Sequence, residues 1–354
     1  MAQVSDDFEH GLTVDPVAVT AWQAGRDGAL TFDHSRIGQL ETAVTLDPQF
    51  ALGHAMLGRQ KLIHGDWPAG LAALDQAMTL AIGATERERS LIALLHGAAH
   101  GRANTLASAL VHVETWPTDI IAFSLVIGPF GLHAFSGRTD WRQTNVAMMA
   151  KYRSLWPQDH WWYLANEAFT EVEGGLIRQG RARAEKAWQV RQTGTAAHSM
   201  SHAHIEDNAQ DEGLAFVDMW LAGPGVGSDM RHHIHWHKSI FEFDMGRSNA
   251  DHASHHFATS LSAAVSDPMP LSTFSDNASF LWRAKLRDYV TPAPYIAETL
   301  AYMDRHYPNG GFVFADVHRI CAAALTEDKR RMQQLLAEFR LRDTERNTAT
   351  SRYM

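Results

Sequence analysis

The spacing of apolar residues limits what this chain can fold into more than any other feature of its sequence. Apolar residues recur at intervals of three and four along most of the 354 positions, a pattern typical of amphipathic helices. Alternating Val-rich runs, which would predict strands, are rare. The Asn309-Gly310 pair follows a proline instead of joining two alternating segments. The sequence therefore predicts an all-α protein.

Residues 51–84 give the clearest helix–turn–helix unit. The first helix carries Gly58, whose small size permits a second helix to approach closely, and Gly65 supplies the turn. The second helix has apolar residues such as Leu74 on its packing side, and Pro48 closes the preceding segment. This order of small, turn and apolar residues is typical of the tetratricopeptide repeat (TPR).

Later units keep the helix–turn–helix length while their sequences diverge. Successive first helices are expected to start near Glu86, Thr118, His160, Ala196, Arg231, Thr273 and Phe312, at intervals of 32 to 42 residues. Stacked units bury one continuous core, and each needs its neighbours. We therefore predict one TPR-like α-solenoid or superhelix over residues 1–354, either open or closed into a toroid. A polar tail is expected from about residue 343.

Composition restricts the partners and the compartment that the sequence predicts. The net charge of −9 provides no basic footprint for a nucleic acid or an anionic membrane. The longest apolar run, residues 120–132, is too short to span a bilayer. The single cysteine, Cys321, cannot form an internal disulfide and fits a reducing compartment. We expect a cytoplasmic protein without nucleic-acid or membrane partners, and a homodimer is compatible with the exposed ends of a repeat array.

Histidines concentrate in the second half of the chain, and ten of the 21 fall within residues 197–257. Three pairs have the i, i+4 spacing that places both imidazoles on one helix face: His198/His202, His233/His237 and His252/His256. If equivalent positions of first helices stack along one inner surface, four units bring polar groups to it. These groups are His198, His202, His233, His237, Asp276, Asp316 and His318.

This convergence has a structural and a functional interpretation. The histidines can be hydrogen-bonded packing residues, some of them at the surface. However, so many imidazoles and carboxylates are costly to bury without mutual pairing or a ligand, which favours a functional cleft. The remaining histidines of the segment, His204, His232, His235, His252, His255 and His256, are expected on the supporting shell or the surface.

Metal binding and metal-free acid/base chemistry both remain open for such a cleft. His198, His202, His233 and His237 are the predicted ligands of a divalent ion such as Zn²⁺, although no HExxH motif is present. Asp276 and Asp316 would orient the histidines or bind the metal, and His318 would act as a further base or ligand. The predicted ligand-contacting side chains are Trp236, Arg283, Tyr163 and Glu167.

Five segments together resemble the tetratricopeptide repeat protein 38 family, over about residues 15–325. They are LDPQFALGHAMLG (46–58), HSMSHAHIED (198–207), HHIHWHKSIFEFDMG (232–246), SDNASFLWR (275–283) and FADVHRICAA (314–323). The resemblance implies a TPR-like fold. It also marks His198, His202, His233, Trp236, His237, Asp276, Arg283, Asp316 and His318 as the family's motif positions, and it implies no general reaction.

From the cleft we predict a hydrolase-like enzyme, either metal-dependent or metal-free, that acts on a small polar molecule by hydrolysis or proton transfer. The alternative is a non-catalytic TPR adaptor that binds a peptide or small ligand in its groove. Basic clamp residues along first helices would favour the adaptor, and Lys61 is nearly the only candidate. Metal storage or sensing through the same histidines is a third interpretation, which predicts metal binding without turnover.

Overall fold

The structure is a computed structural model that describes residues 4–5, 8, 10–128, 130–246, 250–289, 292–309, 313–326 and 328–345. These residues are mostly helical, so the all-α prediction is confirmed. Within these ranges the strands are β1 (Val4–Ser5) and β2 (Gly11–Leu12), which form one antiparallel pair. The polar tail predicted from about residue 343 lies outside the described residues from 346 onward.

The chain divides into two compact units, one ending at Ser199 and the other beginning at Met200. The division falls within α12 (Gly194–Glu206). The single repeat domain over residues 1–354 stays a prediction.

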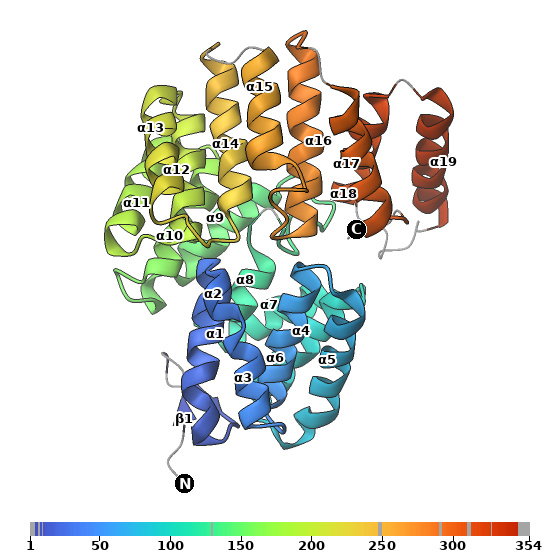
Figure 1. The fold of residues 1–354 in the computed structure, drawn as a ribbon. Helices are drawn as coiled ribbons and strands as arrows, with labels where there is room; N and C mark the ends of the chain where they lie inside the picture. Colours follow the sequence, from blue (N-terminus) through green and yellow to red (C-terminus); the bar gives the residue numbers. More distant parts are fainter. Residues whose placement is uncertain are drawn as a thin grey trace. The chain divides into compact units, whose positions relative to one another are not determined.

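Helical hairpins build the first unit, and α4 packs on α5 as α10 packs on α11 (Figure 1). Its helices before α12 are α1 (Val19–Thr31), α2 (His34–Ile37), α3 (Gln39–Leu46), α4 (Ala51–Ile63), α5 (Trp67–Leu80), α6 (Glu86–Ala99), α7 (Thr105–Thr115), α8 (Ile120–Val126), α9 (Trp141–Tyr152), α10 (Trp161–Glu173) and α11 (Ile177–Val190). Short 3₁₀ helices cover Pro16–Ala18, Ala81–Gly83 and Arg153–Leu155.

The α4–α5 hairpin shows why its residues form this unit. Gly65 has a φ of 84°, in the left-handed region that glycine adopts most easily, and it makes the predicted turn. Asp66 then caps α5 by accepting a hydrogen bond from the backbone N–H of Ala69. A Cβ added at Gly58 would lie 2.8 Å from the carbonyl oxygen of Gly70, so glycine is what lets the two helices approach.

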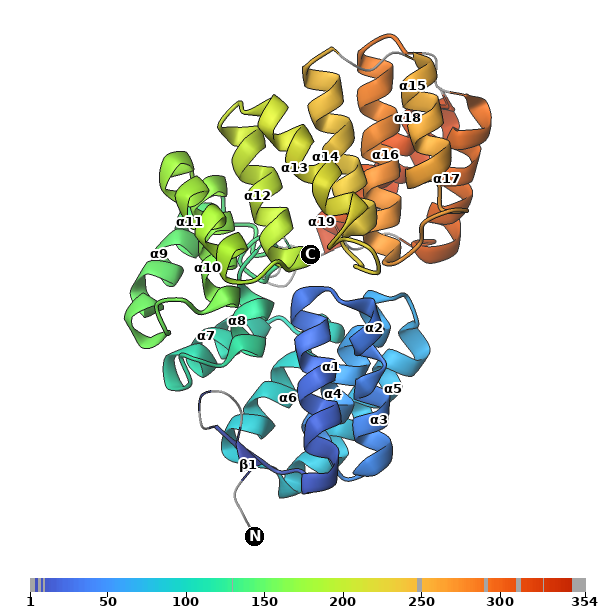
Figure 2. The ribbon, with the colours of Figure 1, turned by 60° about the vertical axis from the view of Figure 1, so that its left-hand side comes forward.

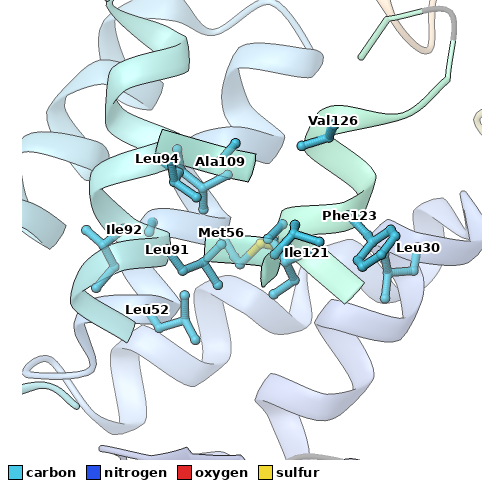
Figure 3. Close-up of a cluster of buried hydrophobic side chains, with 14 of the residues drawn as sticks. Leu30, Leu52, Met56, Leu91, Ile92, Leu94, Ala109, Ile121, Phe123 and Val126 are labelled. Atoms are coloured by element: carbon cyan, nitrogen blue, oxygen red, sulfur yellow. The ribbon is translucent and has the colours of Figure 1, made fainter. Parts of the chain in front are cut away.

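One apolar core runs through most of the first unit, from Leu12 to Tyr163. Figure 3 shows part of it, to which α4 contributes Met56, α6 contributes Leu91, and α8 contributes Ile121 and Phe123. These four side chains are almost completely shielded from solvent. Neighbouring hairpins therefore share one core, as expected for stacked repeats.

The second unit continues with α13 (Gln210–Ala222), α14 (Arg231–Asp244), α15 (Ala250–His256), a π-helix (Phe257–Leu261), α16 (Pro270–Leu286), α17 (Ala293–His306), α18 (Val313–Ala324) and α19 (Lys329–Glu345). Helix α14 packs on α16, beside which it lies in Figure 2, and α16 also packs on α18. The first helices of successive units are therefore neighbours here. No helix in the described part of the chain is both long and apolar enough to span a membrane.

The predicted helix starts agree with the structure to within three residues. Helices α6 and α14 begin at Glu86 and Arg231, as expected, and α12 begins at Gly194 instead of Ala196. The expected start near Phe312 lies outside the described residues, and α18 is described from Val313.

Candidate metal centre

Two helices bring the predicted histidines together. His233 and His237 lie one turn apart on α14, and their ring centroids are 4.6 Å apart. His202 on α12 places its ring centroid 4.8 Å from that of His237. His198 precedes His202 by one turn of the same helix, and one nitrogen from each of the four rings lies within 4.8 Å of the others. We call these four residues the histidine cluster.

Asp276 on α16 orients one ring of the histidine cluster. Its Oδ2 is 2.9 Å from Nδ1 of His233, and the residue is 5% exposed. A carboxylate at this position keeps the proton on Nδ1, so Nε2 is the nitrogen that can coordinate a metal. The arrangement is the carboxylate–histidine pair that commonly supports a metal ligand.

His232 was expected in the supporting shell or at the surface, and the structure places it completely buried beside Asp276. Its Nε2 is 4.0 Å from Oδ2 of Asp276, and in the described part of the chain neither ring nitrogen has a hydrogen-bond partner. Burial lowers the pKa of His232 to about 4, against the opposing effect of the Asp276 charge. The ring is therefore neutral at pH 7. Its adjacency to His233 in the sequence was the only signal for this position.

Trp236 and Arg283 extend the polar surface beside the cluster. The Trp236 ring stacks on His233, with centroids 5.2 Å apart and an interplanar angle of 15°. The guanidinium carbon of Arg283 lies 5.3 Å from the centroid of Trp236, within the range of a cation–π interaction. His233, Trp236 and Arg283 thus form one continuous stack across α14 and α16.

His318 on α18 occupies the next helix, where its Nδ1 lies 2.8 Å from the carbonyl oxygen of Phe314. Burial lowers the pKa of His318, although this backbone bond and the Asp276 charge act in the opposite direction. Burial also raises the pKa of the Cys321 thiol one turn further along α18. Both side chains are therefore uncharged at pH 7.

Three other predicted site residues have partners elsewhere. Asp316 pairs with Arg319 at 3.2 Å, and Arg319 also reaches Glu338 of α19 at 3.5 Å. In the first unit, the hydroxyl of Tyr163 donates to the carbonyl of Met149. Glu167 there lies 3.0 Å from Arg183. These contacts hold helices together and do not join the histidine cluster.

The opposite face of α14 lines a groove of about 400 Å³. Arg231, His235 and Lys238 contribute from α14, and His252, His255 and His256 from α15. Burial, reinforced by neighbouring positive groups, lowers the pKa of His235 to about 3. His252 lies 3.0 Å from Glu242, which in turn is 3.6 Å from Lys238. Most histidines that were expected off the predicted face therefore gather in this groove.

Comparison with known proteins identifies the fold. No protein-family model and no curated protein matches the sequence. The structure resembles that of the human IFIT1 dimer with m7Gppp-AAAA, with a TM-score of 0.54 and 12% identity over 90% of this chain and 71% of that chain. It also matches the P58(IPK) TPR domain, with a TM-score of 0.23 and 12% identity over 94% of this chain and 100% of that domain. The chain is thus a TPR-like helical-repeat protein.

The predicted hydrolase acting on a small polar molecule is wrong. The IFIT1 structure that shares its fold contains m7Gppp-AAAA, and this favours the adaptor alternative.

The predicted partners, a small-molecule substrate and no nucleic acid, are corrected as well. The similar IFIT1 structure contains a capped oligonucleotide. Net charge describes the whole chain, whereas a binding site depends on the local arrangement of groups. An acidic total of −9 therefore does not exclude a nucleic acid.

Proposed function

We propose that this protein is a non-catalytic, TPR-like adaptor of the tetratricopeptide repeat protein 38 type. A divalent metal ion such as Zn²⁺ would bind at His202, His233 and His237, with His198, one turn before His202 on α12, as the fourth ligand. The adjoining surface of Trp236 and Arg283 would bind a polypeptide segment of a partner protein. The observation that carries the proposal is the histidine cluster with Asp276 behind it.

The chemistry of the cluster suits a borderline-soft divalent cation. Neutral imidazole is a preferred ligand of Zn²⁺, and bonds of about 2.0–2.1 Å place the ligand nitrogens of a tetrahedral site about 3.3 Å apart. The four candidate nitrogens lie within 4.8 Å of one another, so rotations of the side chains suffice to close the site. Without an ion, edge-to-face contacts between these imidazoles would contribute little to the stability of the fold.

The neighbouring surface suits a protein partner. Tryptophan and arginine contribute disproportionately to the binding energy of protein interfaces. Trp236 and Arg283 are both partly exposed, and the guanidinium lies against the indole ring. A partner carboxylate could pair with Arg283 while an apolar side chain covers Trp236. The metal would fix the rotamers of His233 and His237 and thereby the position of Trp236.

Elemental analysis tests whether the histidine cluster binds a metal ion. Untagged protein, purified without chelators, is compared with His233→Ala/His237→Ala, and the variant is expected to lose about one equivalent of metal while circular dichroism stays unchanged. His252→Ala/His255→Ala removes two histidines from the groove on the opposite side and is the matched control, which should retain the ion. Equal metal contents in wild type and His233→Ala/His237→Ala would refute the site.

Peptide selection tests the adaptor function. Peptides selected from a random library on the metal-loaded protein are measured against Trp236→Ala and Arg283→Ala, and both variants should bind at least about tenfold more weakly. The capped oligonucleotide m7Gppp-AAAA, the ligand in the IFIT1 structure, is titrated in parallel. Saturable RNA binding with no selectable peptide would replace the polypeptide by a nucleic acid as the ligand.

A further inference from the structure

A second group of potential metal ligands lies in the first unit, on the α5–α6 pair. His96 is in the last turn of α6, and His100 is the residue that caps this helix. Asp75 projects from α5, which packs against α6. We propose that Asp75, His96 and His100 form a second divalent-metal site, for an imidazole-preferring ion such as Zn²⁺, Ni²⁺, Co²⁺ or Cu²⁺.

The distances within this group resemble those between the ligands of a bound ion. Oδ1 of Asp75 lies 2.9 Å from Nε2 of His96 and 3.5 Å from Nε2 of His100. The two ring centroids are 4.2 Å apart. A tetrahedral ion with bonds of about 2.0–2.1 Å would hold its ligand atoms about 3.3 Å apart. The two measured distances lie on either side of this value, so an ion could enter with shifts of a few tenths of an ångström.

Burial and charge also suit metal binding. His96 is 7% exposed and is therefore held by its surroundings, whereas His100 and Asp75 face solvent. An aspartate that faces solvent is ionised at neutral pH, as a metal ligand must be. Two imidazoles, one carboxylate and an open side toward water make a three-ligand site with room for solvent.

This site should be weaker than the histidine cluster. In the described part of the chain, Nδ1 of His96 is buried and has no hydrogen-bond partner, whereas Asp276 supports His233. A missing partner behind a ligand typically lowers metal affinity by about 10–100-fold. The two sites should therefore fill in sequence, with the cluster filling first.

Zinc titration of the chelator-stripped full chain by calorimetry tests the proposal, with Co²⁺ absorption as a second readout. Wild type should show two binding phases. Asp75→Asn and His100→Gln change solvent-facing side chains and should weaken only the second phase, by at least about tenfold. His233→Ala/His237→Ala should lose only the first phase.

The outcomes separate the two metal sites. Binding phases that Asp75→Asn and His100→Gln all leave unchanged overturn the α5–α6 site, whether the wild type shows one phase or two. Loss of the first phase alone bears only on the histidine cluster. Asp140→Asn, an exposed substitution in the same unit, is the control and should preserve both phases.

Discussion

A buried carboxylate in the first unit shows how single residues set the stability of this fold. Asp119 is completely shielded and lies 2.8 Å from Arg87 and 3.2 Å from His112. It also accepts hydrogen bonds from the backbone N–H groups of Ile121 and Ala122 at the start of α8. One side chain thus joins the α6 and α7 helices to the cap of α8.

Asp119→Asn should destabilise the protein by about 3–5 kcal/mol, because the substitution removes the buried negative charge that lies against Arg87. Chemical denaturation measures the change. Asp140→Asn breaks a solvent-exposed pair with Arg138 and should give no measurable change. An Asp119→Asn protein as stable as the wild type would show that this ion pair contributes nothing.

Low pH should remove the contribution of Asp119 to folding stability. Burial alone would raise the pKa of Asp119, but the His112 hydrogen bond and the charges of Arg87 and His112 lower it overall. Because the folded pKa lies below the unfolded value of about 3.9, the stabilisation is complete above the unfolded pKa and is lost as pH falls through the folded one. Denaturation midpoints between pH 6 and pH 2 should fall less steeply for Asp119→Asn than for the wild type.

The sequence could predict some site residues and not others because the direction of a side chain depends on small rotations. His233 and Asp276 are 43 positions apart in the sequence and meet across α14 and α16, as the repeat period predicts. Asp316 lies 40 positions further on and points toward Arg319 instead. Each residue of error in a helix start turns its side chains by about 100°, so spacing alone cannot assign a face.

At the level of helices, the α4–α5 hairpin tolerates no added side chain at its crossing point. Gly58→Ala should destabilise the protein by about 1–3 kcal/mol, because the new Cβ would meet the Gly70 carbonyl at 2.8 Å. Gly38→Ala is the matched control, since its Cβ would have no atom within 4 Å, and it should be neutral or slightly stabilising. Equal thermal midpoints for the two variants would contradict close packing at Gly58.

Regular helices could be predicted from the sequence, but the insertions between them could not. Glu86 starts α6 because Thr85 and Glu88 form a capping box that is visible in the sequence. Between α8 and α10 the chain adds a long turn before α9, and α15 runs into a π-helix. Such insertions lengthen the local period to about 42 residues without leaving a periodic apolar pattern.

For the whole molecule, metal binding should increase the free energy of unfolding. An ion that binds only the folded state adds about 2.7 kcal/mol at a concentration one hundred times its Kd. Zn²⁺ should therefore raise the thermal midpoint of the chelator-treated wild type, and EDTA should reverse the change. His233→Ala/His237→Ala should respond much less. Equal shifts in both proteins would assign the effect to ions bound elsewhere.

Helix α14 carries polar side chains on two opposite sides. His233 and His237 belong to the histidine cluster, whereas Arg231, His235 and Lys238 line the groove. A one-residue insertion near its start would turn the following residues by about 100° and would misplace both sets at once. Descendants of this chain should therefore vary α14 by substitution and keep its length, while insertions and deletions accumulate in the connections on either side.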